Sequence, residues 1–189
     1  MNYRKLIILA SMVCAASLPV MSARADSGIY VGAGLGQSNM KDVPGNPGAA
    51  PGGSFDESAA AGKAFVGYYF DWIPLVRFAA EVGYRDLGKP AGSVAGVAVE
   101  YQATGFDYGV LAGLGLGPVD LFARVGGMNY DLKKTVGGVS NDYTGNAPVY
   151  GIGVWFTVFG LGVRAEYDVI DIKQLDSAQM ATISAFYRF

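Results

Sequence analysis

The sequence predicts an all-β fold, an eight-stranded antiparallel transmembrane β-barrel. Three observations predict it. Short segments alternate between apolar and small or polar residues with a period of two, glycine and charged residues share one face of these segments, and long and short connections follow one another in turn. After the first 25 residues, no segment shows a helical period or the roughly 20 apolar residues that a spanning helix needs.

Eight segments carry the alternation. They are residues 29–37, 62–70, 77–86, 97–115, 121–130, 148–157, 161–168 and 181–189. In the third segment, Val82 and Tyr84 lie on the apolar face, whereas Glu81 and Arg85 lie on the other face. We expect each segment to form one strand with two different faces.

The polar face of these segments contains too much glycine to be the water-exposed side of a soluble barrel. The same face fits the inside of a narrow barrel, because eight strands enclose only enough space for their own side chains. The charges predicted to face the lumen are Lys63, Glu81, Arg85, Asp107, Arg124, Arg164, Glu166 and Asp168. Breaking one buried ion pair costs about 3–5 kcal/mol, so we expect all of them to be paired.

The expected pairs can be stated for two carboxylates. Glu81 is expected to pair with Arg85, Arg124 or Arg164, and Glu166 with a second arginine. Structural pairing is the simplest interpretation of these charges. The alternative is a gate, in which ion pairs that exchange partners open a narrow water path.

The connections support the same topology. Residues 38–61, 87–96, 131–147 and 169–180 are expected to form long loops, and residues 71–76, 116–120 and 158–160 to form short turns. Their strict alternation sends all long loops to one rim, as in barrels with long extracellular loops and short periplasmic turns. Both termini are then expected in the periplasm. In the first loop, Asp42, Asp56 and Glu57 could meet divalent cations beside lipopolysaccharide phosphates.

Aromatic residues gather near the expected strand ends, as an interface belt requires. On the short-turn side they are Phe70, Trp72, Phe78, Phe156, Tyr187 and Phe189, and on the long-loop side Tyr84, Phe106, Tyr108 and Tyr150. One ring on each side would bracket the bilayer.

Residues 1–25 predict a signal peptide, because Arg4 and Lys5 precede an apolar stretch and small residues precede a cleavage site between Ala25 and Asp26. Residues 26–189 are expected to form one barrel domain. The 14 basic residues of the whole chain fall to 11 without residues 1–25, against 16 acidic residues. This acidic balance, without a basic run, argues against nucleic-acid binding.

The composition also argues against catalysis. The chain has no histidine, the commonest general base near neutral pH, and its one cysteine lies in the expected signal peptide. Glu100 and Asp107 could act as bases but have no evident serine partner. The glycine strings at 32–36 and 113–117 lack the spacing of a nucleotide loop. We therefore expect no enzyme activity, no cofactor and no metal site.

Several motifs resemble the OmpA/OmpX-like eight-stranded outer-membrane barrels of Gram-negative bacteria. The motifs are Gly32-Ala33-Gly34-Leu35-Gly36, Gly62-Lys63-Ala64-Phe65-Val66-Gly67-Tyr68, Glu81-Val82-Gly83-Tyr84-Arg85-Asp86-Leu87-Gly88, Arg164-Ala165-Glu166-Tyr167 and Tyr187-Arg188-Phe189. The resemblance implies that Tyr187 and Phe189 form an assembly signal for the barrel-insertion machinery. With the signal peptide, it also implies secretion by the translocon and a monomer among outer-membrane lipids and lipopolysaccharide. The sequence departs from the larger family members, because it stops at Phe189, and we expect a barrel alone without their peptidoglycan-binding domain.

Two functions follow as expectations. The first is a non-enzymatic barrel that contributes to outer-membrane structure and surface interaction. The alternative is porin-like transport through a narrow, low-conductance pore, which eight strands leave little room for.

Overall fold

The computed structural model describes residues 27–50, 52–73 and 75–189, and the side chains of residues 71 and 72 lie outside this description. The described strands are β1 Gly28–Asp42, β2 Phe55–Ile73, β3 Val76–Asp86, β4 Ala91–Val94, β5 Val97–Leu116, β6 Val119–Val136, β7 Val139–Val158, β8 Leu161–Ile170 and β9 Ser177–Arg188. Among these residues, no helix is long and apolar enough to cross a membrane. The expected signal peptide and its cleavage site between Ala25 and Asp26 lie outside the described residues.

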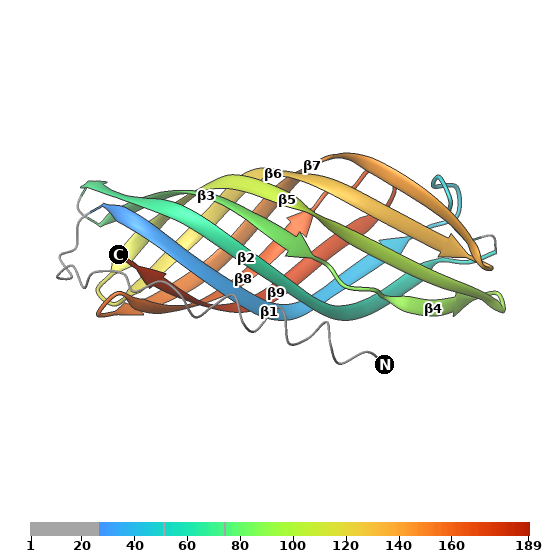
Figure 1. The fold of residues 1–189 in the computed structure, drawn as a ribbon, viewed down its shortest axis with the longest axis horizontal. Helices are drawn as coiled ribbons and strands as arrows, with labels where there is room; N and C mark the ends of the chain where they lie inside the picture. The colour runs from blue at the N-terminus through green and yellow to red at the C-terminus, as the bar shows by residue number, and fades with distance from the viewer. Residues whose placement is uncertain (1–26, 51, 74) are drawn as a thin grey trace, which may run out of the picture.

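The strands form a closed antiparallel barrel (Figure 1). Apart from β3 and β4, neighbours in sequence pair with each other, β9 pairs with β1, and β3 pairs with β5. The short β4 pairs with the start of β5 beyond the end of β3, so it continues the line of β3 rather than adding a ninth strand to the ring. The predicted fold class, an antiparallel ring of eight strands, is therefore confirmed.

The two rims of the barrel differ. At the rim that we call the turn rim, β5 joins β6 and β7 joins β8 through two-residue turns, and β1 begins and β9 ends there. Phe159 and Gly160 both have positive φ, as the tight turn between β7 and β8 requires. The opposite end, the loop rim, carries residues 43–50, 52–54, 95–96, 137–138 and 171–176. Residues 87–90 lie in the barrel wall between β3 and β4, where Leu87 and Pro90 form backbone hydrogen bonds with Ala103 and Tyr101 of β5.

The strands are longer and the loops shorter than the sequence predicted. The clearest correction concerns residues 131–147, which were expected to form a loop. They continue β6 and β7 up to a two-residue turn at Gly137 and Gly138, both with positive φ. The loop predicted over residues 38–61 likewise shrinks to residues 43–54.

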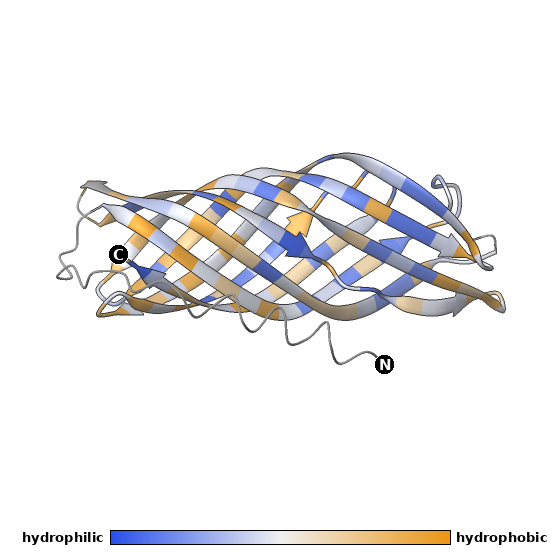
Figure 2. Ribbon diagram, viewed as in Figure 1, coloured by the Kyte–Doolittle hydropathy of each residue, from blue (hydrophilic) through white to orange (hydrophobic). Residues whose placement is uncertain are grey.

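The polarity of the barrel reverses along its axis, which explains why these strand ends were missed. In β6 the outward side chains change from Leu121 and Val125 to Asn129 and Asp131, while inward Leu132 is fully buried. Polar outward residues of other strands toward the loop rim include Asn39, Asp56, Ser58, Glu100, Asp142, Thr144 and Asn146. Figure 2 shows the apolar residues gathering on the turn-rim half and hydrophilic residues becoming frequent toward the loop rim.

The outward aromatic residues lie on both sides of the apolar band. Phe78, Phe156 and Tyr187 are exposed on the turn-rim side. Tyr84 and Phe106 stack edge to face, with ring centroids 5.2 Å apart, close to the level where the outer surface becomes polar. The position predicted for Trp72 concerns a side chain outside the description.

A buried charge cluster as the candidate functional site

The lumen is filled by three layers of side chains. Nearest the turn rim is an aromatic layer formed by Tyr30, Phe65, Tyr69, Ala79, Leu111, Phe122, Trp155 and Phe186. The middle layer is charged, and an apolar layer that includes Met40, Phe55, Leu87, Tyr101, Met128, Leu132 and Ile172 fills the loop-rim half. The interior is thus a packed core from one rim to the other.

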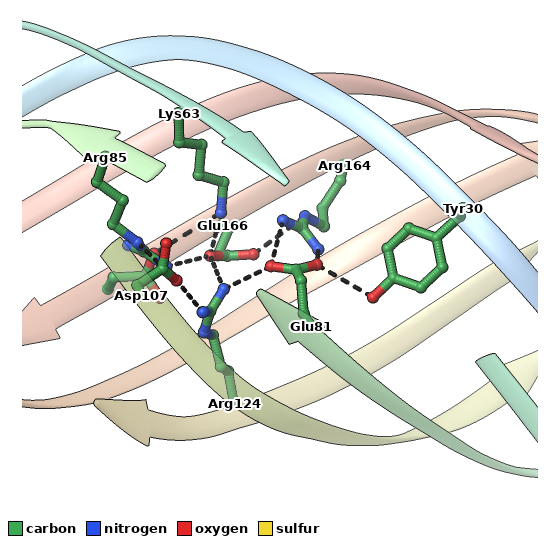
Figure 3. Close-up of polar contacts among 9 residues, drawn as sticks. Tyr30, Lys63, Glu81, Arg85, Asp107, Arg124, Arg164 and Glu166 are labelled. Atoms are coloured by element: carbon green, nitrogen blue, oxygen red, sulfur yellow. Dashed lines mark hydrogen bonds and ion pairs between the residues drawn. The ribbon is translucent and has the colours of Figure 1, made fainter. Parts of the chain in front are cut away.

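The charge layer contains all eight residues that the sequence predicted to face the lumen. Four are cations and four are anions, so the layer has no net charge. They come from five strands: Lys63 from β2, Glu81 and Arg85 from β3, Asp107 from β5, Arg124 from β6, and Arg164, Glu166 and Asp168 from β8. Every one of these side chains is buried. Figure 3 shows the charged groups of Lys63, Glu81, Arg85, Asp107, Arg124, Arg164 and Glu166 pointing toward one another.

Glu81 connects two arginines. Its carboxylate accepts hydrogen bonds at 2.6 Å from Nη1 of Arg124 and at 2.6 Å from Nη1 of Arg164. Arg124 also donates to Asp107, and Arg164 lies 3.0 Å from Glu166 through Nε. Charge-assisted bonds of this kind are stronger than neutral ones, so the shared carboxylate joins the two sides of the layer.

Glu166 and Asp168 hold the other two cations. Lys63 donates to Glu166, and Arg85 donates to Asp168. Nε of Arg85 lies 3.1 Å from Asp107, which links this half of the layer to Arg124. Because each charge has an opposite charge within ion-pair distance, the arrangement balances the desolvation of all eight.

Tyr30 is a partner that the sequence reasoning missed. Its hydroxyl donates a 3.1 Å hydrogen bond to Glu81, and its ring packs edge to face on Phe65 and Trp155 in the aromatic layer. The alternation in the first segment placed Tyr30 on the glycine face, the face of the lumenal charges. Its position on this face could have predicted that the Tyr30 hydroxyl bonds to a lumenal charge.

The aromatic layer explains the lumenal glycines. A side chain at Gly67 would collide with the ring of Tyr30, its direct cross-strand partner, and Gly153 stands in the same relation to Phe122. The same pairing holds for Gly32 with Phe65 and for Gly162 with Phe186. Each ring therefore occupies the space that a glycine on the neighbouring strand leaves open.

A second buried ion pair lies in the loop-rim half. Nζ of Lys134 lies 2.9 Å from Asp42, which also accepts a 2.7 Å hydrogen bond from the Tyr101 hydroxyl. Lys134 further donates to the backbone oxygens of Pro47 and Gln174, one from each of the two loops 43–54 and 171–176. Burial lowers the pKa of Lys134, and the Asp42 carboxylate acts in the opposite direction.

This ion pair was not foreseen, because Asp42 and Lys134 both fell in segments that were predicted to be loops. It also corrects the suggestion that Asp42 meets divalent cations outside the barrel, since the residue is 1% exposed and bound to Lys134. Asp56 is exposed and lies 4.0 Å from Lys41. Among the described residues, no group of three or more carboxylate or other metal-ligating side chains could hold a metal ion.

The arrangement offers pairing rather than covalent chemistry. Asp107, one of the two carboxylates considered as a base, is bound to Arg124 in the charge layer, and Glu100 lies exposed on the outer face of β5. The glycine string at 32–36 lies within β1, and the string at 113–117 ends β5 at its turn. The ion pairs of the charge layer can stay fixed, which blocks water and ions, or exchange partners, which would let them pass.

The chain end lies at the turn rim. The backbone NH of Phe189 donates a 2.9 Å hydrogen bond to the Ile29 oxygen, and its ring lies 4.8 Å from that of Tyr187. Both rings are partly exposed on the outer surface.

Several solved structures resemble this barrel, among them three small outer-membrane barrels. One is Ail, the attachment invasion locus protein of Yersinia pestis, solved in complex with the heparin analogue sucrose octasulfate. Its TM-score is 0.59 and its sequence identity is 15%, and the match covers 87% of this chain and 99% of that chain. Neisserial surface protein A has a TM-score of 0.56 and 15% identity, covering 86% and 99%. The N-terminal β-barrel domain of Pseudomonas aeruginosa OprF has a TM-score of 0.51 and 11% identity, covering 86% and 98%. At these identities the likeness shows the fold.

The sequence comparisons give the family. No curated protein sequence matches the chain. A family described as "Outer membrane protein beta-barrel domain" matches residues 6–189, which include every residue of the charge layer. With this match over nearly the whole length, and with a closed ring of eight strands that resembles solved outer-membrane barrels, the chain belongs to the outer membrane protein beta-barrel domain family.

Proposed function

We propose that this protein is a closed, non-enzymatic barrel that contributes to outer-membrane structure and presents a rigid surface to the outside of a Gram-negative cell. The observation that carries the proposal is the reversed polarity of the loop-rim half. That half has an apolar interior and a polar exterior, as a water-soluble protein has, and it stands on an apolar band that suits lipid.

The proposed orientation puts the loop rim outside the cell and the turn rim, with both termini, in the periplasm. Short turns at the periplasmic end are typical of bacterial barrels. We further propose that the mature chain is a monomer among outer-membrane lipids and lipopolysaccharide. It would reach this state through the secretion translocon and the barrel-insertion machinery, with Phe189 as part of the signal.

The charge of the outer surface favours a basic partner. In the loop-rim half, the exposed or half-buried acidic residues are Asp56, Glu57, Asp86, Glu100, Asp131, Asp142, Asp171 and Asp176, against the lysines Lys41, Lys89, Lys133 and Lys173. Ail was solved with a sulfated heparin analogue. An acidic surface repels such a polyanion, so we expect this chain to bind cationic ligands in preference to sulfated sugars.

Cysteine labelling on intact cells tests the proposed orientation. Once the expected signal peptide is removed, the sequence contains no cysteine, so a single introduced cysteine reports one position. Asp142→Cys, on the outer face of β7 near the loop rim, should react with a membrane-impermeant maleimide. Val163→Cys, exposed on the apolar band, should remain unlabelled. Labelling of neither position in a folded, membrane-inserted protein would contradict the orientation.

The alternative function, a narrow low-conductance pore, draws support from the shared partners in the charge layer. Glu166, for example, lies within ion-pair distance of Lys63, Arg85, Arg124 and Arg164, so its pairs could exchange. A pore would also require displacement of the aromatic and apolar layers on either side. Bilayer conductance separates the two functions.

A further inference from the structure

A shallow apolar groove of about 780 Å³ lies on the outer surface of the membrane-spanning band. Ala165 of β8 and Val154 of β7, direct cross-strand partners, form its floor. On either side of them in the same row stand the larger Ile183 and Leu121. Small side chains between larger exposed ones leave a hollow that faces lipid.

A polar pocket of about 180 Å³ adjoins this groove on the side of the loop rim. The groove and the pocket share Gln37, Tyr167 and Ala181 in their linings. The pocket is also lined by Asn39, Ser58 and Gln179, so its outward polar groups are amides and hydroxyls. It lies where the outward residues of β1 change from Leu35 to Gln37, the level of the boundary between lipid and water.

The polar groups of the pocket are partly engaged with one another. The Tyr167 hydroxyl donates a 2.7 Å hydrogen bond to Oε1 of Gln179, and Nδ2 of Asn39 donates to Oγ of Ser58 at 3.2 Å. The Gln37 side-chain amide makes no hydrogen bond to another residue that the structure describes. An amide can donate and accept at once, which suits a ligand hydroxyl.

We propose that the groove and the pocket together bind one molecule of an uncharged lipid with a hydroxyl-rich headgroup, such as a sugar. Its acyl chain lies over Ala165 and Val154, and its hydroxyls bond to Gln37 and the neighbouring amides. A phosphate is disfavoured, because the pocket lining has no cation and nearby Lys41 lies 4.0 Å from Asp56. The inference requires insertion in a bilayer and is independent of whether the lumen conducts.

The opposite face of the barrel offers a matched control. A second apolar groove of about 630 Å³ lies over β2, β3 and β5, with Ala80 on its floor. Toward the loop rim, the outer surface of β3 and β5 continues with the aromatic pair Tyr84 and Phe106. The Tyr108 hydroxyl in its lining accepts a hydrogen bond from Asn146, which also donates to Asn129. This groove can accept an acyl chain, but the Asn146 amide beside it is already bonded to Tyr108 and Asn129, whereas the Gln37 amide is available to a headgroup.

Photo-crosslinking in phosphatidylcholine nanodiscs tests the proposal with the full barrel. Three probes carry the same photoactivatable acyl chain on a galactosyl diacylglycerol, a phosphatidylcholine and a phosphatidylglycerol. Mass spectrometry maps the labelled strands. We expect the galactosyl probe to label the strands around Ala165 in preference to those around Ala80, and the two phospholipid probes to show no such preference.

Three variants locate the effect. Ala165→Phe fills the groove and should abolish the preferential labelling, whereas the matched Ala80→Phe should leave it unchanged. Gln37→Ala should lower galactosyl labelling about fivefold, the factor expected for one lost hydrogen bond, without changing phosphatidylcholine labelling. A gel shift between unboiled and boiled samples verifies folding, and Gln37→Ala, at an exposed position, carries the test if Ala165→Phe fails to insert.

Three results would overturn the proposal. They are equal labelling of the two grooves by the galactosyl probe, equal labelling of the Ala165 groove by all three probes, and unchanged galactosyl labelling in Gln37→Ala. Preferential labelling by phosphatidylglycerol as well would overturn the requirement for an uncharged headgroup.

Discussion

Replacing Glu81 by alanine removes the carboxylate that joins the two halves of the charge layer. Arg124 and Arg164 each lose a 2.6 Å hydrogen bond, and Tyr30 loses its 3.1 Å acceptor. The layer then carries one excess positive charge inside a core that water does not reach. We expect the free energy of unfolding to fall.

The remaining contacts set the size of the loss. Breaking a buried ion pair costs about 3–5 kcal/mol when the partner is left uncompensated. Arg124 keeps Asp107 and Arg164 keeps Glu166, so neither arginine is left alone. We therefore expect the lower end of that range, about 3 kcal/mol.

Urea titration in detergent micelles measures this loss, with the gel shift between folded and unfolded barrel as the readout. Glu100→Ala is the matched control, because Glu100 lies exposed on the outer face of β5, and it should change stability by less than about 0.5 kcal/mol. If Glu81→Ala is as stable as the control, the charge layer does not stabilise the barrel and the reasoning is refuted.

Three further predictions concern other parts of the chain. Gly67→Val should cost about 1–3 kcal/mol in the same titration, because the new side chain meets the ring of Tyr30; an unchanged midpoint would contradict the ring packing. Burial lowers the pKa of Lys134 in the folded state below its ordinary value of 10.5, so the unfolded chain binds more protons and stability should rise as the pH increases toward 10.5. Lys134→Met should remove that rise, and an identical pH profile would show that Lys134 is not its source. Phe189→Ser should reduce the fraction of folded barrel in the outer membrane without abolishing refolding of purified protein in detergent, and normal insertion in cells would contradict an assembly role.

The membrane-spanning half was predictable from sequence because its two faces differ so strongly. Val82 and Tyr84 alternate with Glu81 and Arg85, and only one orientation satisfies both lipid and a narrow lumen. The same alternation brought the eight charged residues to one face. It could not specify the pairing, because which arginine meets Glu81 depends on the stagger of strands that are distant in sequence.

The loop-rim ends of β1, β2, β6 and β7 were missed for a physical reason. These strand ends keep the period of two, but their outward residues, such as Asp131 and Lys133, are polar and resemble loop composition. The turn at Gly137 and Gly138 was a hairpin signal, since two adjacent glycines accommodate two positive φ angles. The residues that flank this turn show no apolar outward face. Lys134 and Asp42 lie in such strand ends, so their buried ion pair was not predicted either.

The central claim is that the three packed layers close the lumen. Single-channel recording of the purified barrel in a planar lipid bilayer tests it most directly, with the gel shift verifying that the inserted protein is folded. The claim predicts no discrete conductance steps for the wild-type chain. Stable steps whose amplitude changes in Arg124→Ala would contradict it and establish a pore through the charge layer.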